Sequence, residues 1–225
     1  MLSSFISNAK DLLIATKSSI NMYIMSFLSI DCCTENASFF IKIKNKTFIK
    51  ILQNNKLNND LLMKQILDFF KENDISFDDI HKIFVNQGPG NFSGLRTSLA
   101  IAKGISLSKE IKLYGYDNFI WSTANFFNKA KYIFSLIKFR EKYYIKKFDS
   151  NLKSLSLPKE ILENEIFNKY SDKFLIIPKK TAKYMNKKIL KISNLGIANL
   201  KHNELEFLQL KGLLSEKLIK PLYLS

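Results

Sequence analysis

The first third of the chain alternates short apolar segments with clusters of turn-forming residues. Segments 26–31, 36–43 and 46–52 are rich in Phe and Ile, and Asn- and Lys-containing turns separate them, which predicts three consecutive strands. A helical period follows over 58–72, with Asn58 or Asn59 as the expected N-cap. Its apolar residues span an arc of roughly 160°, wider than the ~100° that one contact surface needs, so this helix is expected to meet two surfaces. The apolar residues on this arc are Leu62, Met63, Ile66, Leu67, Phe69 and Phe70.

A strand, a tight turn and a second helix come next. The β-branched and aromatic strand 82–86 runs into Gly88-Pro89-Gly90, and no other breaker interrupts the helix at 93–108. Gly is free to adopt positive φ, so Gly88 and Gly90 are expected to permit the turn, which Pro89 stiffens. The helix is apolar or small nearly all the way round, which requires cover on more than one side.

One face of this second helix carries small residues on which another helix could lie closely. The face comprises Gly94, Ser98, Ile101, Gly104, Ile105 and Ser108. Two interpretations stay open: a core helix buried in its own subunit, or a helix shared between its own sheet and a partner.

The order of these elements predicts the fold class. With a further strand at 111–115 it reads β-β-β-α-β-α-β, which favours an α/β unit in which antiparallel strands lead into right-handed crossovers. The second half is fainter, and no internal sequence repeat is apparent. Its expected elements are helices at 117–129 and 199–211 and strands at 131–137, 143–148 and 173–177.

Composition narrows the class of protein. The chain has 225 residues, of which 46% are hydrophobic, and no apolar run reaches the roughly 18 residues that span a bilayer. The adjacent Cys32 and Cys33 cannot build a disulfide framework, so a cytoplasmic location is expected.

The net charge of +15 is less informative than its size suggests. Lysines are scattered along a chain that is also rich in Asn, Ile and Phe, and codon bias in an AT-rich genome produces this composition without functional demand. Direct RNA contact is therefore the less favoured interpretation, although basic domains do hold RNA through its phosphates. The two arginines, Arg96 and Arg140, lie in motif-like segments, where a planar guanidinium group with five hydrogen-bond donors could have a specific role.

Candidate catalytic groups are few. His81 and His202 lack the spacing of a zinc site, and Cys32-Cys33 are expected to be buried small hydrophobes. Asp31 and Glu35 are the only carboxylates that we nominate for metal chemistry, and Asp31 is more simply a turn-capping residue. The glycines at 88, 90 and 94 fit neither the dinucleotide fingerprint nor a P-loop.

The segment Gly88-Pro89-Gly90-Asn91-Phe92-Ser93-Gly94-Leu95-Arg96, followed by Ala102-Lys103-Gly104, resembles the G-P-G-S-F-T-G-L-R…A-K-G signature of the TsaB (YeaZ) family. The likeness runs from about Met25 to about residue 148 and returns at 221–224. The resemblance implies an actin-like (RNase H-like, ASKHA) α/β fold of two βββαβα-type halves, the second reduced. It divides the chain into an extension at 1–24, an N-terminal subdomain at 25–116 and a smaller C-terminal subdomain at 117–225.

The same resemblance implies a function. TsaB is the dimerisation subunit of the bacterial machinery that makes threonylcarbamoyladenosine in tRNA, with the TsaD transferase and the TsaE ATPase as partners and tRNA reached through the complex. In TsaD, a following strand leads to an H-x-x-x-H metal motif, whereas the corresponding stretch here, 114–121, has Trp121 and no histidine. A non-catalytic subunit without cofactor or metal is therefore expected.

The expected partner surface consists of the two helices and the turn. It comprises Leu62, Ile66, Phe69, Gly88, Pro89, Gly90, Phe92, Gly94, Leu95, Arg96, Ser98, Ile101, Gly104 and Ile105. The same face would allow a homodimer when the chain is alone. Two alternatives remain: a small actin-fold ATPase or sugar kinase that uses Asp31 and the 88–94 turn, and a free-standing RNA-binding protein.

Overall fold

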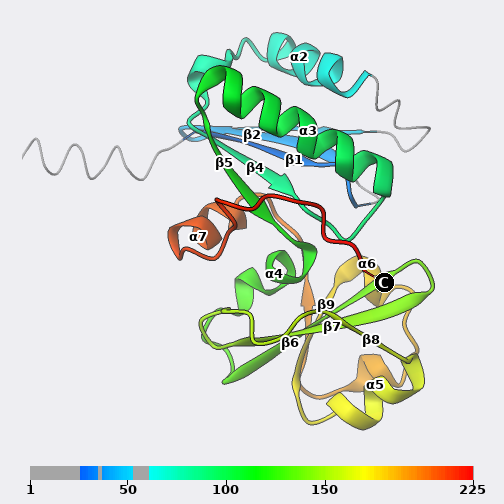
Figure 1. Cartoon of the computed structure of the whole chain (residues 1–225). Coiled ribbons are helices and arrows are strands. Elements are labelled where there is room, and N and C mark those ends of the chain that lie inside the picture. Colours follow the sequence, from blue (N-terminus) through cyan, green and yellow to red (C-terminus); the bar gives the residue numbers. More distant parts are fainter. Residues whose placement is uncertain (1–25, 35–36, 53–60, 225) are drawn as a thin grey trace, which may run out of the picture.

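The computed structural model describes residues 26–34, 37–52 and 61–224, which form two five-stranded sheets with helices around them (Figure 1). The first sheet has the order β3-β2-β1-β4-β5. Strands β1 to β3 are antiparallel, and β4 and β5 continue parallel to β1. The strands are β1 (Phe27–Asp31), β2 (Ser38–Ile43), β3 (Lys46–Ile51), β4 (Lys82–Asn86) and β5 (Lys112–Tyr116). All five expected strands of this half are confirmed within one or two residues.

Two helices cover one face of this sheet (Figure 1). Helix α2 (Leu62–Glu72) and helix α3 (Phe92–Lys109) pack on the alternate strand residues that point toward them, such as Leu28, Ile30 and Val85. The expected N-caps of α2, Asn58 and Asn59, lie outside the described residues. The short turn η2 (Phe77–Asp79) leads from α2 into β4.

The second sheet repeats the topology of the first. Its order, β10-β9-β6-β7-β8, again combines three antiparallel strands with two parallel ones. The strands are β6 (Tyr132–Phe139), β7 (Lys142–Asp149), β8 (Lys159–Ile161), β9 (Phe174–Pro178) and β10 (Leu195–Ala198). Helix α5 (Glu163–Tyr170), helix α6 (Lys179–Ala182) and the turn η4 (Ile189–Lys191) complete this half. The second half is thus reduced in its helices and retains a full set of strands.

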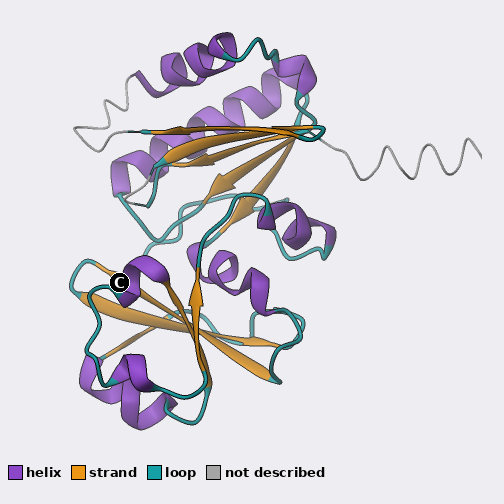
Figure 2. Cartoon of the chain, turned by 180° about the vertical axis from the view of Figure 1, so that it is seen from behind, coloured by secondary structure: helices purple, strands orange, loops and turns teal. Residues whose placement is uncertain are grey.

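Helical elements fill the space between the sheets (Figure 2). Helix α4 (Asn118–Thr123) is buried along its whole length and continues into η3 (Ala124–Phe126), so the helix expected at 117–129 is shorter than predicted. Helix α7 (Glu204–Leu210) begins later than the predicted 199 and packs on η3. His202, just before α7, lies between Ser29 and Ser38 with its ring stacked on Phe40.

The last segment of the chain returns to the first half. Ser215 and Gly115 exchange backbone hydrogen bonds of 2.8 and 2.9 Å, and Leu222 N–H donates to the Gln87 carbonyl at 2.7 Å. The Ile219 side chain is buried in the same core as α2 and α3. None of the described helices is long and apolar enough to cross a membrane.

Candidate functional site

The turn between β4 and α3 depends on the backbone conformation of Gly88 and is fixed by hydrogen bonds to two asparagine side chains. Gly88 has φ +100°, the region that favours glycine, and its peptide bond to Pro89 is cis. The Gly88 N–H donates to Asn86 Oδ1 at 2.8 Å, and Asn118 Nδ2 donates to the Pro89 carbonyl at 2.7 Å. Side chains of this subunit therefore fix the turn before any partner binds.

Gly90 and Gly94 are required for a different reason, namely close approach of the backbone. A Cβ on Gly90 would lie 2.2 Å from the Cys33 carbonyl oxygen, and one on Gly94 would lie 2.4 Å from that of Cys32. The role expected for Gly90, a positive φ, is wrong, because positive φ occurs only at Gly88 and Gly212 among the glycines that the structure describes. The start of α3 is thus pressed against the end of β1.

Asp31, at the end of β1, is closed off from solvent. It is 1% exposed and accepts hydrogen bonds from the Cys33 and Thr34 backbone N–H groups, from the Thr34 hydroxyl and from Asn86 Nδ2. Burial raises the pKa of this carboxyl above 3.8, although each of these hydrogen bonds lowers it. The arrangement is an Asx turn that ties β1 to β4, as the simpler interpretation of the sequence proposed.

Two backbone N–H groups at this turn are already paired within the chain. A phosphate site of this type needs unpaired backbone N–H groups at a helix N-terminus. Here Asn91 N–H donates to the Cys33 carbonyl at 3.1 Å, and Ser93 N–H donates to Asn91 Oδ1 at 3.2 Å. Glu35, the second nominated carboxylate, lies outside the described residues.

The other candidate groups are structural in their contacts. Cys32 and Cys33 are buried, and burial raises the pKa of both thiols. Burial lowers the pKa of His202 to about 4. Trp121, which stands where the transferase motif would place histidine, is buried and donates its indole N–H to the Lys201 carbonyl at 3.0 Å. Within residues 26–34, 37–52 and 61–224, no three His, Cys, Asp or Glu residues are grouped so as to hold a metal.

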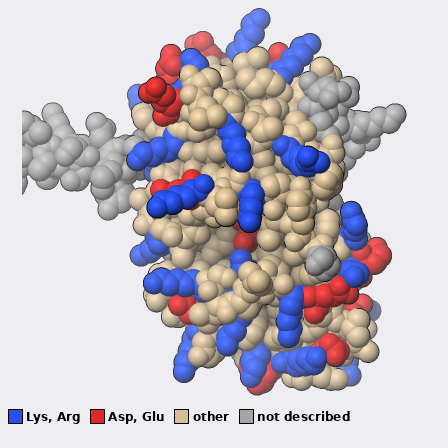
Figure 3. Space-filling view, viewed as in Figure 1, with Lys and Arg blue, Asp and Glu red and all other residues tan. Residues whose placement is uncertain are grey.

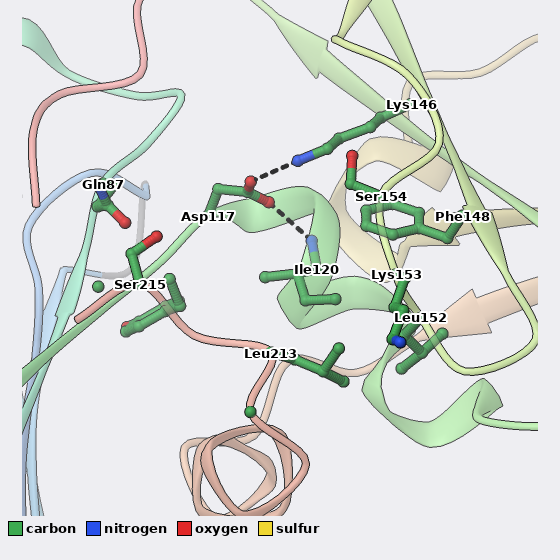
Figure 4. Close-up of a pocket in the computed structure, with 13 residues that line it drawn as sticks. Gln87, Asp117, Ile120, Lys146, Phe148, Leu152, Lys153, Ser154, Leu213 and Ser215 are labelled. Carbon is green, nitrogen blue, oxygen red and sulfur yellow. Dashed lines mark hydrogen bonds and ion pairs between the residues drawn. The ribbon is translucent and has the colours of Figure 1, made fainter. Parts of the chain in front are cut away.

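A pocket of about 340 Å³ opens between the two halves, beside the Asp117–Lys146 ion pair (Figure 4). The two charged atoms are 2.8 Å apart, and the other Asp117 oxygen accepts the Ile120 N–H at 2.8 Å. Among the described residues that line this pocket, Asp117 is the only carboxylate.

The structure divides the expected partner surface into a buried part and an exposed part. The buried residues face their own core: Leu62, Ile66, Phe69, Gly88, Pro89, Gly94, Leu95, Ser98 and Ile105. Phe92, Arg96 and Gly104 are exposed, and Gly90 and Ile101 are half-buried. Residues of the buried group could affect a partner contact only indirectly, by holding the exposed residues in place. That the exposed group contacts a partner stays a prediction.

Ser98 is the clearest correction within this set. It belonged to the small face that we expected to receive a partner helix, but it is 0% exposed and its hydroxyl donates to the Leu95 carbonyl at 3.1 Å. The small residues Gly94 and Ser98 bring α3 close to its own sheet. Gly104 is the opposite case, since a Cβ placed there would meet no atom within 4 Å.

Sequence reasoning missed the apolar side chains that do point outward from α2 and α3. Leu107 is 82% exposed, Leu67 47% and Met63 36%, and Leu61 just before α2 is also exposed. Met63 and Leu67 lie at the edge of the wide apolar arc of α2, which was the signal for a second contact surface. Leu107 could have been found from the same wheel as an apolar residue opposite the buried face of α3.

An aromatic contact connects this surface to the end of the chain. Phe92 at the start of α3 stacks on Tyr223, with ring centroids 5.5 Å apart, and the Arg96 guanidinium lies 5.2 Å from the Phe92 centroid. Arg140, the other arginine, occupies the β6–β7 turn with φ 54° and is exposed. The two arginines thus stand on different elements.

The middle of the chain resembles proteins of tRNA modification. Residues 55–133 match the family model of TsaD, the tRNA N6-adenosine threonylcarbamoyltransferase. Over 83 residues, 36% of this chain, it is 35% identical to the tRNA threonylcarbamoyladenosine biosynthesis protein TsaB of Buchnera aphidicola subsp. Baizongia pistaciae (strain Bp). A TsaB of Buchnera aphidicola subsp. Schizaphis graminum (strain Sg) is 28% identical over 89 residues, 39% of this chain. The chain is thus similar to TsaB proteins over this part of its length.

The likeness to these curated TsaB proteins is partial in length. The aligned part of the chain spans 37% of the first relative and 42% of the second. The family-model match at 55–133 includes helix α3 with the glycine motif, where the family signature was found.

Two solved structures share the fold over most of the chain. YeaZ from Pseudomonas aeruginosa superposes with a TM-score of 0.63 at 15% identity, over 89% of this chain and 100% of that one. A second Pseudomonas aeruginosa structure, of an uncharacterized protein with similarity to peptidase YEAZ, gives 0.65 at 14% identity with the same coverage. These likenesses confirm the actin-like α/β fold predicted from the sequence.

Proposed function

We propose that this chain is a non-catalytic subunit of the machinery that makes threonylcarbamoyladenosine in tRNA. In this proposal it pairs with a TsaD-type transferase through the outer face of α2 and α3, and a TsaE-type ATPase joins the pair. The modified base is the adenosine next to the anticodon, and the location is the cytoplasm.

One observation carries the proposal: apolar side chains project from the two helices although their inner faces already fill the core. Leu107, Leu67 and Met63 are all at least 36% exposed, and a Cβ at Gly104 would meet no atom within 4 Å. Exposed apolar groups that lie together typically mark a protein interface. A related subunit with the same two helices could bury them in a helix-to-helix contact at the usual 8–10 Å between axes.

The non-catalytic part of the proposal is supported by the closed state of Asp31. A carboxylate that accepts four internal hydrogen bonds and is 1% exposed has no direct path to a substrate. The stretch that would carry the transferase histidines holds the buried Trp121 instead. Purified alone, the chain should therefore show no metal-dependent threonylcarbamoyl transfer to tRNA.

The partner surface can be tested by titrating the chain into the TsaD-type transferase of the same organism and measuring heat. Gly104→Leu and Leu107→Glu should each weaken binding about tenfold or more, because they place bulk or charge in the contact. Both positions are exposed, so circular dichroism and melting temperature should stay near those of the unmodified chain.

A matched control is Ile49→Glu, which adds the same charge at an apolar residue of β3 that is 59% exposed on the other face of the sheet. If Ile49→Glu weakens binding as much as Leu107→Glu, or if neither α3 variant has an effect, the proposed interface is wrong. If the isolated chain instead binds and hydrolyses magnesium ATP, the alternative ATPase or kinase replaces the whole proposal.

A further inference from the structure

The segment after β9 forms helical turns with one buried face and one basic face. Tyr184 N–H donates to the Thr181 carbonyl at 3.1 Å and Ile189 N–H to that of Asn186 at 3.0 Å, so one turn follows α6 and a second leads into η4, with a break at Asn186. Met185, Ile189 and Ile192 are buried in the core of the second sheet. The opposite face carries Lys179, Lys183, Lys187, Lys188 and Lys191, all exposed.

These five lysines differ from many others in being unpaired. Lys138, Lys142, Lys146, Lys169 and Lys173 of the same half each bind a carboxylate within 4 Å. Within the described part of the chain, no ion pair involves any of the five lysines of the basic face. The carboxylate of Glu163 in α5 accepts the backbone N–H of Asn186 at 3.1 Å, and so binds the backbone of this segment and not a lysine of it.

The distribution of charge along the chain is uneven. Residues 173–203 contain eight lysines and no Asp or Glu. Residues 117–225 hold 21 basic against ten acidic residues, whereas 25–116 hold 12 against nine. Basic side chains are visible on both halves in Figure 3, so what distinguishes this segment is that it contains no Asp or Glu of its own. A codon bias that acts on the whole chain does not account for such a local difference.

An exposed aromatic ring stands among these lysines. Tyr184 is 62% exposed, and the Lys138 ammonium lies 6.0 Å from its ring centroid. Unpaired lysines that track a phosphate backbone, with an aromatic ring on which a base can stack, are the features by which proteins hold single-stranded or looped RNA.

We propose that the 179–191 segment is an RNA-binding surface, with its lysines on phosphates and Tyr184 under a base. A membrane surface is the less suitable partner, because it requires an apolar face directed outward. Here Met185, Ile189 and Ile192 are buried in the protein core. That the RNA is a tRNA rests on the proposed function, and the surface itself does not.

The surface can be tested with the full chain and a fluorescently labelled tRNA transcript, by anisotropy at several salt concentrations. The test variant replaces Lys183, Lys187 and Lys191 by Gln. The matched control replaces Lys44, Lys46 and Lys112, three exposed lysines of the first half, so that both variants lose the same charge. Lys188 is left in place because its ammonium lies 5.1 Å from the Phe167 ring.

The test variant should bind about tenfold or more weakly at moderate salt, and its salt slope should fall by about one for each lysine that contacts a phosphate. Tyr184→Ala should weaken binding about fivefold or more without changing the slope. The control should bind like the unmodified chain, and melting curves should show all variants folded.

Three results would overturn the inference: no binding by the unmodified chain, equal losses in the test and control variants, or equal dependence on the three lysines for anionic phosphatidylserine vesicles. None of them bears on the pairing with the transferase, which is measured separately without RNA. Conversely, if the chain fails to bind the transferase but binds tRNA through these lysines, the proposed function is wrong and the inferred RNA-binding surface is confirmed.

Discussion

Both halves of the molecule extend three antiparallel strands by two parallel ones, but they connect the last two strands differently. In the first half the connection is α3, with 18 residues. In the second half the corresponding connection contains α6, with four residues, and the turn η4. The strand order fixes only which two strand ends the connection must join. The length and structure of the connecting segment can therefore differ between the halves.

The two connections also differ in what they present outward. Helix α3 exposes Leu107 and Gly104 together with Arg96, Lys103 and Lys109, whereas the 179–191 segment exposes five lysines. Exposed apolar groups suit a protein partner, and unpaired basic groups suit a polyanion. The same strand framework thus carries two connections with different exposed side chains, and mutations in each can show how far the halves differ.

The largest effect is expected from one added methyl group at the start of α3. In Gly94→Ala the new Cβ would lie 2.4 Å from the Cys32 carbonyl oxygen. Because that oxygen belongs to the backbone, the helix must move, and we expect the free energy of unfolding to fall by about 3 kcal/mol or more. Urea denaturation followed by circular dichroism measures it.

Gly196→Ala in β10 is the matched change in the second half. Its Cβ would meet the ends of the Ile176 and Phe126 side chains at 2.5 and 2.7 Å. Since side chains can shift more easily than backbone, a loss of only about 1 kcal/mol is expected. Equal losses at Gly94 and Gly196 would show that the close packing of α3 is not special to the first half.

A pH-dependent effect is expected from His202, which lies against the first sheet just before α7. Burial lowers its pKa to about 4 from the usual 6.5. Between these values the unfolded chain binds a proton that the folded chain does not, so stability should fall as pH drops from 6.5 to 4, by about 3 kcal/mol in all.

The comparison with His202→Gln isolates this contribution, because an amide can still bond one of the two serines but does not titrate. Asp31, with its raised pKa, contributes in the opposite direction at acidic pH in both proteins. Denaturation at pH 7, 6, 5 and 4 should give a shallower loss for the variant. Parallel curves would contradict the assignment.

The smallest effect concerns how α3 ends. Its C-cap, Glu110, has φ 55°, whereas α6 ends at Lys183 with an ordinary helical φ of −61°. Glu110→Gly should stabilise the protein by about 0.5–1 kcal/mol, because glycine adopts this conformation without strain. The neighbouring change Lys109→Gly, inside the helix, should destabilise it by about 1 kcal/mol. Thermal melting distinguishes the two signs.

The sequence predicted the first half well because its signals are local. Alternating apolar strands, a wide apolar arc on α2 and the 88–90 breaker each follow from neighbouring residues. The second half was harder. Strands β8 and β10 have only three and four residues, which is too short for a strand's alternation of apolar and polar residues to be recognised. Helix α5 buries only Ile166, so it shows no helical repeat of apolar residues.

The orientation of α3 was predicted wrongly for another reason. This helix is apolar or small nearly all the way round, and its polar stripe of Arg96 and Lys103 is narrow. Both stripe residues are exposed, and Ser98, which lies opposite them on the helix, was assigned outward but is buried. Leu107 was not assigned and is exposed. The contact of Gly90 and Gly94 with the Cys32-Cys33 backbone joins segments some 60 residues apart, and no local pattern reports it.

The return of the chain end to Gln87 and Gly115 has a consequence for the order of assembly during synthesis. The first sheet is complete at Tyr116, but the hydrogen bonds from Ser215 to Gly115 and from Leu222 to Gln87 are unavailable until residues 215–222 leave the ribosome. Contacts that join residues so far apart are slow to form, because a long loop must close first. The first half is therefore synthesised before the segment that completes its hydrogen bonds. Until then, Gln87 and the edge of β5 are exposed in the nascent chain.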